Sequence, residues 1–167
     1  MKTGLKLSVI TITYNDVEGF RRTVESVESQ TWRGFEWIVI DGGSSDGTKV
    51  YLESLNPQPD YWVSEPDRGV YDAMNKGIAQ AKGEYLLFMN GGDSFCNERV
   101  LEEVFNGFPD GDIVYGDAIY HFRDGVKKVC HPDVFNLYHL WITYATCHQP
   151  AFVRQSNQGR RWVLYKI

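Results

Sequence analysis

Two predicted strands end in turns that combine glycine with acidic side chains, and this feature constrains the fold more than any other. Residues 37–40 (WIVI) run into residues 41–48 (DGGSSDGT), and residues 85–89 (YLLFM) run into residues 90–93 (NGGD). Parallel α/β sheets bind ligands in the crevice beyond the carboxyl ends of their strands. Carboxylates placed there, on backbone freed by glycine, suit a nucleotide or a metal ion. The two turns predict one nucleotide site.

The order of the remaining patterns predicts an α/β fold. Apolar or β-branched runs predict strands at residues 7–13, 36–40, 61–64 and 84–89, and the 3.6-residue period predicts helices between them. Asn15 and Asp46 are the expected N-caps of the first two helices. Further helices are expected at 70–81, with Val70, Met74 and Ile78 inward, and at 98–106. Residues 112–122 and 126–131 flank a short turn and predict an antiparallel hairpin.

This order favours a single domain over residues 1–167. We expect a mixed, mostly parallel central sheet flanked by helices, with an antiparallel extension at one edge. Residues 155–167 have no helix caps and no clear period, and this stretch is too short for a further helix–strand unit. We therefore divide the domain into a nucleotide-binding core at 5–122 and an incomplete region at 123–167.

Composition excludes several classes of protein. Hydrophobic residues make up 43% of the 167 residues, which predicts a globule and not a disordered chain. The net charge is −5 and no dense basic run occurs, so a nucleic-acid partner is not expected. No apolar run approaches the roughly 20 residues that span a bilayer, so a soluble chain is expected. The three cysteines are widely spaced and lack a CxxC pair, which favours free thiols.

Asp41 and Asp93 are the leading site candidates. Asp41 ends a buried strand and could accept a hydrogen bond from a nucleobase, with Gly42 letting the base approach the backbone. Asp93 could place a hard oxygen ligand on Mg²⁺ or Mn²⁺ beside a diphosphate. For both residues the alternative is a carboxylate that caps the following helix.

A polar helix start lies between the two turns in the sequence. Arg68, Asp72 and Asn75 cluster where the helix beginning near residue 70 should point to the same crevice. Arg68 could reach a base or a phosphate. The alternative is a capped, solvated first turn.

Several segments, in this order, resemble the inverting glycosyltransferases of family 2, which have the GT-A nucleotide-diphospho-sugar fold. The resemblance covers roughly residues 5–153. It rests on 8–15 (SVITITYN), 41–48, 69–77 (GVYDAMNKG) and 81–90 (AKGEYLLFMN). Residues 115–117 (YGD) and 147–149 (CHQ) also resemble a subgroup that builds bacterial surface polysaccharides.

The resemblance implies transfer of a sugar from a nucleoside-diphosphate sugar to a glycan or lipid-linked acceptor, with a divalent cation as cofactor. It implies that Asp41 meets the base and that Asp93 binds Mn²⁺ or Mg²⁺. The residues implied to support the nucleotide sugar are Thr13, Tyr14, Asn15, Gly42, Arg68, Asp72, Asn75, Asn90 and Gly92. A cytoplasmic location is expected, and peripheral association with the inner face of the plasma membrane is compatible with it. Nothing in the sequence indicates the oligomeric state.

The chain departs from this family in two places. The acidic motif that commonly reads Asp-x-Asp-Asp is Asn90-Gly91-Gly92-Asp93, so only its last acid remains. The general base is expected to be a carboxylate beyond residues 147–149, yet no Asp or Glu follows Gln149. Inversion needs a base to take the acceptor proton, and Asp117 and His148 are the candidates. Their alternatives are a loop aspartate and a structural histidine.

Other functions fit the sequence less well or differently. A non-catalytic or truncated nucleotide-sugar-binding module would retain the donor half and lack the base. A dinucleotide-dependent oxidoreductase would need a GxGxxG turn after the first strand, where this chain has Thr13-Tyr14-Asn15-Asp16. A nucleotidyltransferase would need a glycine- and lysine-rich loop at that place, which is absent.

Overall fold

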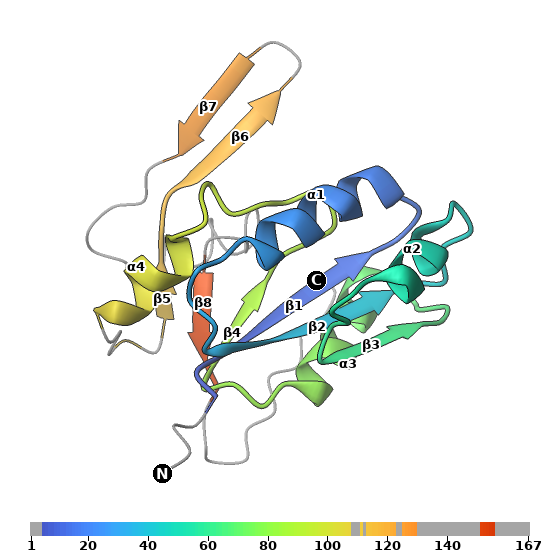
Figure 1. Ribbon diagram of the computed structural model, residues 1–167, viewed down its shortest axis with the longest axis horizontal. Helices are drawn as coiled ribbons and strands as arrows, with labels where there is room; N and C mark the ends of the chain where they lie inside the picture. Colours follow the sequence, from blue (N-terminus) through green and yellow to red (C-terminus); the bar gives the residue numbers. More distant parts are fainter. Residues whose placement is uncertain (1–4, 108–110, 112, 123–124, 130–150, 156–167) are drawn as a thin grey trace.

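The computed structural model describes residues 5–107, 111, 113–122, 125–129 and 151–155. Its strands and helices alternate through the first hundred residues (Figure 1). The strands are β1 (Leu7–Thr13), β2 (Phe35–Asp41), β3 (Tyr61–Ser64), β4 (Tyr85–Phe88), β5 (Ile113–Tyr115), β6 (Ala118–Phe122), β7 (Gly125–Val129) and β8 (Ala151–Arg154). The helices are α1 (Val17–Glu28), α2 (Thr48–Ser54), α3 (Val70–Gln80) and α4 (Val100–Asn106).

Six strands form one sheet, in the order β3-β2-β1-β4-β8-β5. The first four are parallel to their neighbours, whereas β8 runs antiparallel to both β4 and β5. β6 and β7 form a separate antiparallel hairpin that extends away from the main sheet (Figure 1). The predicted α/β fold with a mixed, mostly parallel central sheet is therefore confirmed.

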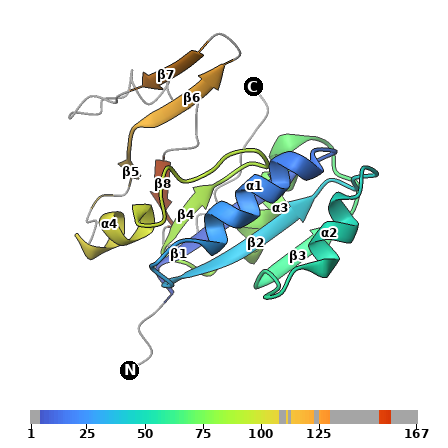
Figure 2. The ribbon, with the colours of Figure 1, turned by 45° about the horizontal axis from the view of Figure 1, so that its top comes forward.

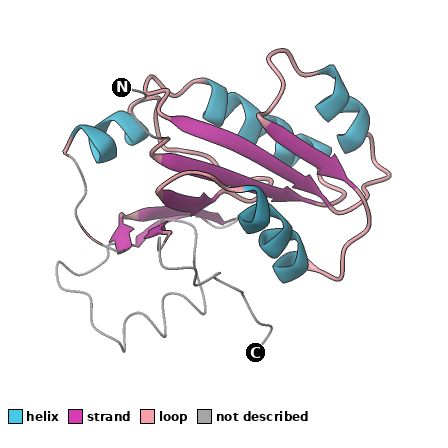
Figure 3. Ribbon diagram, turned by 90° about the horizontal axis from the view of Figure 1, so that it is seen from below, coloured by secondary structure: helices cyan, strands magenta, loops and turns pink. Residues whose placement is uncertain are grey.

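Helices cover both faces of this sheet, with α1 and α3 on opposite sides (Figures 2 and 3). Alternation along β1 divides the core, because successive strand residues point to opposite faces. Leu7 and Val9 pack with the buried residues of α1, α2 and α4, while Ile10 and Ile12 pack with those of α3. β1, β2 and β4 are buried on both faces, which explains why they are rich in apolar residues, whereas the edge strand β3 is exposed to half-buried.

α3 packs closely on the sheet through small residues. Its buried residues are Ala73, Met74 and Gly77, and a Cβ at Gly77 would collide with the Ile10 side chain. The prediction that Val70 lies on the inward face is wrong, because its side chain is 47% exposed. Val70 is the first residue of the helix, and the buried residues of α3 begin at Ala73. Among the helices in the described ranges, none is both long enough and apolar enough to cross a bilayer.

Three local expectations need correction. The N-cap of α2 is Gly47, with a φ of 102°, and Asp46 precedes it and accepts the Thr48 N–H at 3.1 Å. Asp16, not Asn15, caps α1: its side chain accepts the Gly19 N–H, while Asn15 adopts a positive φ of 49°. The predicted 112–122 strand is split, so that β5 joins the main sheet through β8 and only β6 pairs with β7. The strand is divided because β5 finds a partner that lies far away in the sequence.

Candidate functional site

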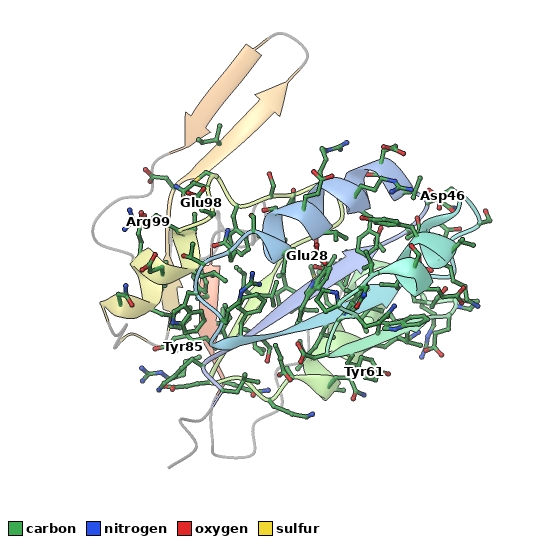
Figure 4. All side chains as sticks on the ribbon, in the orientation of Figure 1. Glu28, Asp46, Tyr61, Tyr85, Glu98 and Arg99 are labelled. Atoms are coloured by element: carbon green, nitrogen blue, oxygen red, sulfur yellow. The ribbon has the colours of Figure 1, made fainter. Side chains whose placement is uncertain are left out.

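The carboxyl ends of the four parallel strands meet at one edge of the sheet. Thr13 is level with Asp41, and Asp41 is level with Ser64. The Gly91 N–H donates to the Ile12 carbonyl, at 2.8 Å, which brings the turn after β4 beside the end of β1. Figure 4 shows Asp46 at this edge of the sheet and Tyr85 at the opposite one. The two acidic glycine-rich turns therefore lie at a common edge, as the sequence predicts.

Asp41 is completely buried, and its carboxylate is surrounded by donors. The Ser64 hydroxyl donates to Oδ2 at 2.6 Å, the Ser44 N–H lies 3.2 Å from each oxygen, and the Ser44 hydroxyl donates to Oδ1. These bonds satisfy a carboxylate that would otherwise be costly to bury. In the structure Asp41 thus orders the first turn by joining it to the end of β3.

The first turn is also joined to the residues after β1. The Asn15 side-chain oxygen accepts the Ser45 N–H at 2.8 Å, and the Asn15 N–H donates to Ser44 Oγ at 2.8 Å. Asp46 accepts the Val17 N–H at 2.8 Å and the Thr48 hydroxyl at 2.6 Å. The hydrogen bond from Thr48 lowers the pKa of Asp46, which keeps its carboxylate ionised. The two loops form one hydrogen-bonded unit.

The glycines of the first turn make room for the loop that follows β3. A Cβ on Gly42 would lie 2.7 Å from an Asp67 carboxylate oxygen and 3.1 Å from the Tyr14 ring. Gly43 has a φ of +83°, and a Cβ there would lie 3.1 Å from the Pro66 nitrogen. The sequence assigned Gly42 to the approach of a base; in the structure the adjacent space holds Asp67 and Tyr14. The Tyr14 side chain itself is 64% exposed.

The start of α3 lies at the same edge and is organised by its own polar residues. Asp72 accepts the Arg68 N–H at 3.1 Å, so its carboxylate orders the loop before the helix, while Arg68 is exposed. Lys76 forms an ion pair of 2.8 Å with Glu65. That hydrogen-bonded carboxylate raises the pKa of Lys76. Asn75, the remaining candidate here, is half-buried on the first turns of α3.

The second turn, Asn90–Asp93, is hydrogen-bonded to Thr23 of α1. The Thr23 hydroxyl, fully buried, accepts the Gly92 N–H at 3.0 Å and lies 2.8 Å from the Asp93 carbonyl oxygen. Within the turn, the Asp93 N–H donates to the Asn90 carbonyl at 2.9 Å, and the Asn90 N–H lies 3.2 Å from Asp93 Oδ2. Gly92 adopts a φ of +98°, a conformation that favours glycine. The turn is therefore fixed relative to the first helix.

Two buried oxygens beside this turn have no hydrogen-bond partner within the described part of the chain. They are Thr13 Oγ1 and Asn90 Oδ1. Thr13 is 7% exposed, and its hydroxyl lies 2.8 Å from the point that a Cβ on Gly91 would occupy. Native proteins seldom leave buried polar atoms unsatisfied, and the exceptions need an explanation such as a ligand. A polar ligand at this edge would supply the missing partners.

The oxygen chemistry of this edge fits a hard divalent cation only if the ligand contributes to its coordination. The described residues contain no cluster of three or more His, Cys, Asp or Glu side chains arranged to hold a metal. Carboxylate oxygens alone would therefore fill few positions on Mg²⁺ or Mn²⁺. Such ions commonly take the rest from phosphates and water.

Of the two candidates for the general base, Asp117 lies among the described residues. Asp117 is exposed and follows β5 in the connection to β6. β5 is parallel to β4, since both run antiparallel to β8, so Asp117 follows a strand that ends at the same edge as Asn90. His148 lies outside the described residues.

Sequence reasoning missed the residues that fix these loops. Ser44 and Ser64 hold Asp41, Lys76 holds the loop after β3, and Thr23 holds the second turn. Thr23 had a detectable signal, because it is a polar residue on the apolar face formed by Phe20 and Val24. A buried threonine on a helix needs a partner for its hydroxyl.

Comparison with known proteins identifies the family. The model for "Glycosyl transferase family 2" matches residues 8–158. An uncharacterised glycosyltransferase of Mycobacterium tuberculosis is 49% identical over 105 residues, which cover 62% of this chain and 40% of that protein. A PGL/p-HBAD biosynthesis glycosyltransferase of Mycobacterium bovis is 34% identical over 161 residues, which cover 91% of this chain and 60% of that protein. The chain thus spans about 40 to 60% of the length of these relatives.

Solved structures agree with this result. Staphylococcus aureus TarS, residues 1–349, was also solved in complex with UDP-GlcNAc; it matches with a TM-score of 0.57 and 26% identity. The match to the TarS structure covers 65% of this chain and 34% of TarS 1–349. A Pyrobaculum calidifontis mannosyltransferase in complex with GDP-Man and Mn²⁺ has the same fold, with a TM-score of 0.58, 21% identity, and coverage of 70% and 35%. The resemblance drawn from the sequence is confirmed: the chain belongs to glycosyl transferase family 2.

Proposed function

We propose that this chain forms the donor side of an enzyme that transfers a sugar, with inversion, from a nucleoside-diphosphate sugar to a glycan or lipid-linked acceptor. The observation that carries the proposal is the pair of unpartnered buried oxygens, Thr13 Oγ1 and Asn90 Oδ1, between the ends of β1 and β4. Family membership and neighbours that bind UDP-GlcNAc or GDP-Man support the same ligand class.

The donor nucleotide would lie across the edge where the four parallel strands end. The exposed Tyr14 ring offers an apolar face to the base, and the exposed Arg68 offers a cation to the base or a phosphate. Thr13 and Asn90 would donate to or accept from polar groups of the ribose and sugar. Asn15 and Asp72 would act by holding the loops, because their side chains bond to backbone groups in the structure.

We propose that Asp41 acts on the base indirectly, and not through the direct hydrogen bond that the sequence predicts. Its carboxylate is buried and bonded to Ser44 and Ser64, so a direct bond to a base would require one of these serines to move. We propose that Asp41 mainly fixes the turn, together with Gly42, against which the base is placed. Asn75 and Gly92 would contribute through the shape of α3 and of the second turn.

Asp93 would hold a divalent cation, Mn²⁺ or Mg²⁺, next to the donor diphosphate. The bound cation would neutralise charge on the leaving diphosphate. Thr23 would keep the Asp93 backbone in place by its contact with the carbonyl oxygen at 2.8 Å. Asp117 follows β5 at the same edge and would take the acceptor proton; His148 is the second candidate for that role.

Calorimetric titration with UDP and with GDP, each with and without Mn²⁺, tests this proposal. We expect one of the two nucleotides to bind more tightly with Mn²⁺ and Asp93→Ala to remove that gain. Equal affinities for the variant and the wild type would contradict the role of Asp93. Absence of binding for both nucleotides would contradict the donor site.

A second function, nucleotide-sugar binding without turnover, is favoured by one observation. Asp93 is the only acid left in the Asn90-Gly91-Gly92-Asp93 motif, which the family resemblance makes part of the donor site. Donor hydrolysis separates the two functions, because a competent site slowly transfers the sugar to water. Sugar release by the wild type that is lost in Asp117→Asn and Asp93→Ala would support the enzyme. Binding with no release would support the module.

A further inference from the structure

We propose that Asp16 supplies a second carboxylate to the divalent cation, in place of the acidic side chain that the Asn90–Asp93 turn lacks at Gly92. The inference rests on the proposed donor function and adds a ligand to it. Neither the sequence motifs nor the glycine-rich turns point to Asp16, whose other oxygen caps α1. The structure brings it to the second turn.

The first observation is the position of the Asp16 carboxylate beside Gly92. A Cβ on Gly92 would lie 3.6 Å from Asp16 Oδ2, the nearest heavy atom to that point. The carboxylate of Asp16 therefore stands beside the place where a side chain of residue 92 would begin. Gly92 has a φ of +98°, so a larger side chain there would strain the backbone. Glycine at position 92 avoids the backbone strain, and aspartate at position 16 supplies a carboxylate beside the turn.

The second observation is that only one of the two carboxylate oxygens of Asp16 is used to cap α1. Oδ1 accepts the Gly19 N–H at 2.9 Å and thereby caps α1. Oδ2 lies over Gly19, where a Cβ would collide with it, and is 3.6 Å from the Cβ position of Gly92. Oδ2 is not the cap acceptor and the Asp16 residue is exposed, so this oxygen can bind a ligand while Oδ1 keeps the cap. One residue can therefore serve the helix and the cation together.

The position of Asp16 is fixed relative to Asp93. Thr23, two turns further along α1, accepts the Gly92 N–H at 3.0 Å and contacts the Asp93 carbonyl oxygen. The helix that begins after Asp16 is thus bonded to the turn that carries Asp93. A divalent cation bound by both carboxylates would offset their charges.

A third observation points independently to a ligand at this place. Thr13 Oγ1, in a residue that is only 7% exposed, has no partner within the described part of the chain. It lies 2.8 Å from the point that a Cβ on Gly91 would occupy, so it faces the same turn. No third carboxylate, histidine or cysteine joins a metal cluster in the described residues. Two carboxylates with diphosphate oxygens and water would complete the octahedron that Mg²⁺ requires.

The test compares Asp16→Asn with Glu18→Gln. Asparagine caps a helix about as well as aspartate, so Asp16→Asn removes the charge and retains the α1 cap. Glu18→Gln removes one charge from the same end of α1, but Glu18 is 77% exposed and pairs with Arg21 instead. The two variants therefore change the net charge equally. Only Asp16→Asn removes a carboxylate that lies beside Gly92.

The measurement is the gain in affinity that Mn²⁺ gives to UDP, and to GDP in parallel, by calorimetry in Mn²⁺ and in EDTA. We expect Asp16→Asn to reduce this gain about tenfold or more, as for the loss of a metal-site partner. Affinity in EDTA should stay within about twofold, and thermal unfolding should match the wild type. Glu18→Gln should retain the wild-type gain.

The outcomes separate this inference from the proposed function. A wild-type gain that Asp16→Asn keeps in full would overturn the role of Asp16 and leave the donor site standing. An equal loss in both variants would also overturn it, because the effect would then be one of general charge. A wild type that binds neither nucleotide more tightly with Mn²⁺ would overturn the cation site itself. Electron paramagnetic resonance of bound Mn²⁺ in the nucleotide complex provides a second readout, and an unchanged spectrum in Asp16→Asn would count against the proposal.

Discussion

The two acidic turns look alike in the sequence but differ in how their polar groups are satisfied. In the first, Asp41 is bonded to Ser44 and Ser64, and Asp46 is bonded to Val17 and Thr48. Beside the second, Thr13 Oγ1 and Asn90 Oδ1 are buried without partners in the described part of the chain. Within the described residues, the carboxylates of the first turn are satisfied by the chain itself, whereas two buried oxygens beside the second turn are not.

This difference suggests that the first turn stabilises the fold and that the oxygens beside the second turn bind the ligand. Changes in the first turn should lower stability, because they break bonds that the chain already makes. Changes at the unpartnered oxygens should lower ligand affinity and leave stability nearly untouched.

Asp41→Ala should cause the largest loss of stability. The substitution leaves the donors of Ser44 and Ser64 without their acceptor at a fully buried position. We expect the free energy of unfolding to fall by about 3 kcal/mol, the scale for losing hydrogen bonds to a buried charged group. Urea unfolding measures it. Ser64→Ala, which removes one donor only, should cost less than half as much; an unchanged midpoint in Asp41→Ala would remove the distinction between the turns.

Thr23→Val should affect both stability and the cation site. The valine leaves the Gly92 N–H without its acceptor and releases the Asp93 carbonyl. We expect a loss of about 1–2 kcal/mol of stability, together with a weaker Mn²⁺ effect on nucleotide binding. Thr23→Ser retains the hydroxyl and should restore the Mn²⁺ effect. A serine variant that behaves like the valine variant would show that packing, and not the hydrogen bond, is responsible.

Thr13→Val should weaken nucleotide binding without loss of stability. Its hydroxyl has no partner among the described residues, so its removal leaves no protein group unsatisfied. We expect affinity to fall by about tenfold, equivalent to one hydrogen bond of about 1.4 kcal/mol. Thr11→Val is the matched control, because Thr11 on the same strand accepts the Trp37 indole N–H at 3.0 Å. That control should lose stability and keep its affinity; the reverse pattern would contradict the assignment.

Lys76→Met should have the smallest effect. Its ion pair with Glu65 is partly exposed, and such pairs contribute about 0.2–1 kcal/mol. The hydrogen bond to Glu65 raises the pKa of Lys76, so the pair stabilises the fold below about pH 10.4, the ordinary lysine value. This stabilisation is lost as pH rises through the raised value. Unfolding curves should therefore separate wild type from variant at pH 7 and converge in strong alkali; a constant gap would contradict the ion pair.

The sequence predicts the fold well where local pattern and tertiary structure agree. The 7–13 and 61–64 strands have the predicted bounds, because each is a run of β-branched or aromatic residues between turn signals. It fails where distant segments decide the outcome. The 112–122 strand is divided because β8 pairs with β5, and Asn15 is not the α1 cap because its side chain bonds to Ser45 from the next loop.

The same limit applies to the candidate site. The order of glycine and acid places Asp41 and Asp93 at one edge, since parallel strands end together. Their environments could not be predicted, because Ser64 and Thr23 reach them from other elements. The position of the Asp16 carboxylate beside Gly92 depends on the packing of α1 against the turn after β4, which no local pattern encodes.

Paramagnetic broadening of backbone amide signals by Mn²⁺, in the presence of the nucleotide that binds, tests the central claim most directly. If the second turn is the ligand side, the amides of Asp16, Gly92 and Asp93 should broaden first as Mn²⁺ is added. Signals at the opposite edge of the sheet, such as Tyr85, should persist. Broadening centred on the opposite edge, or spread evenly over acidic surface residues, would contradict a cation site between β1 and β4.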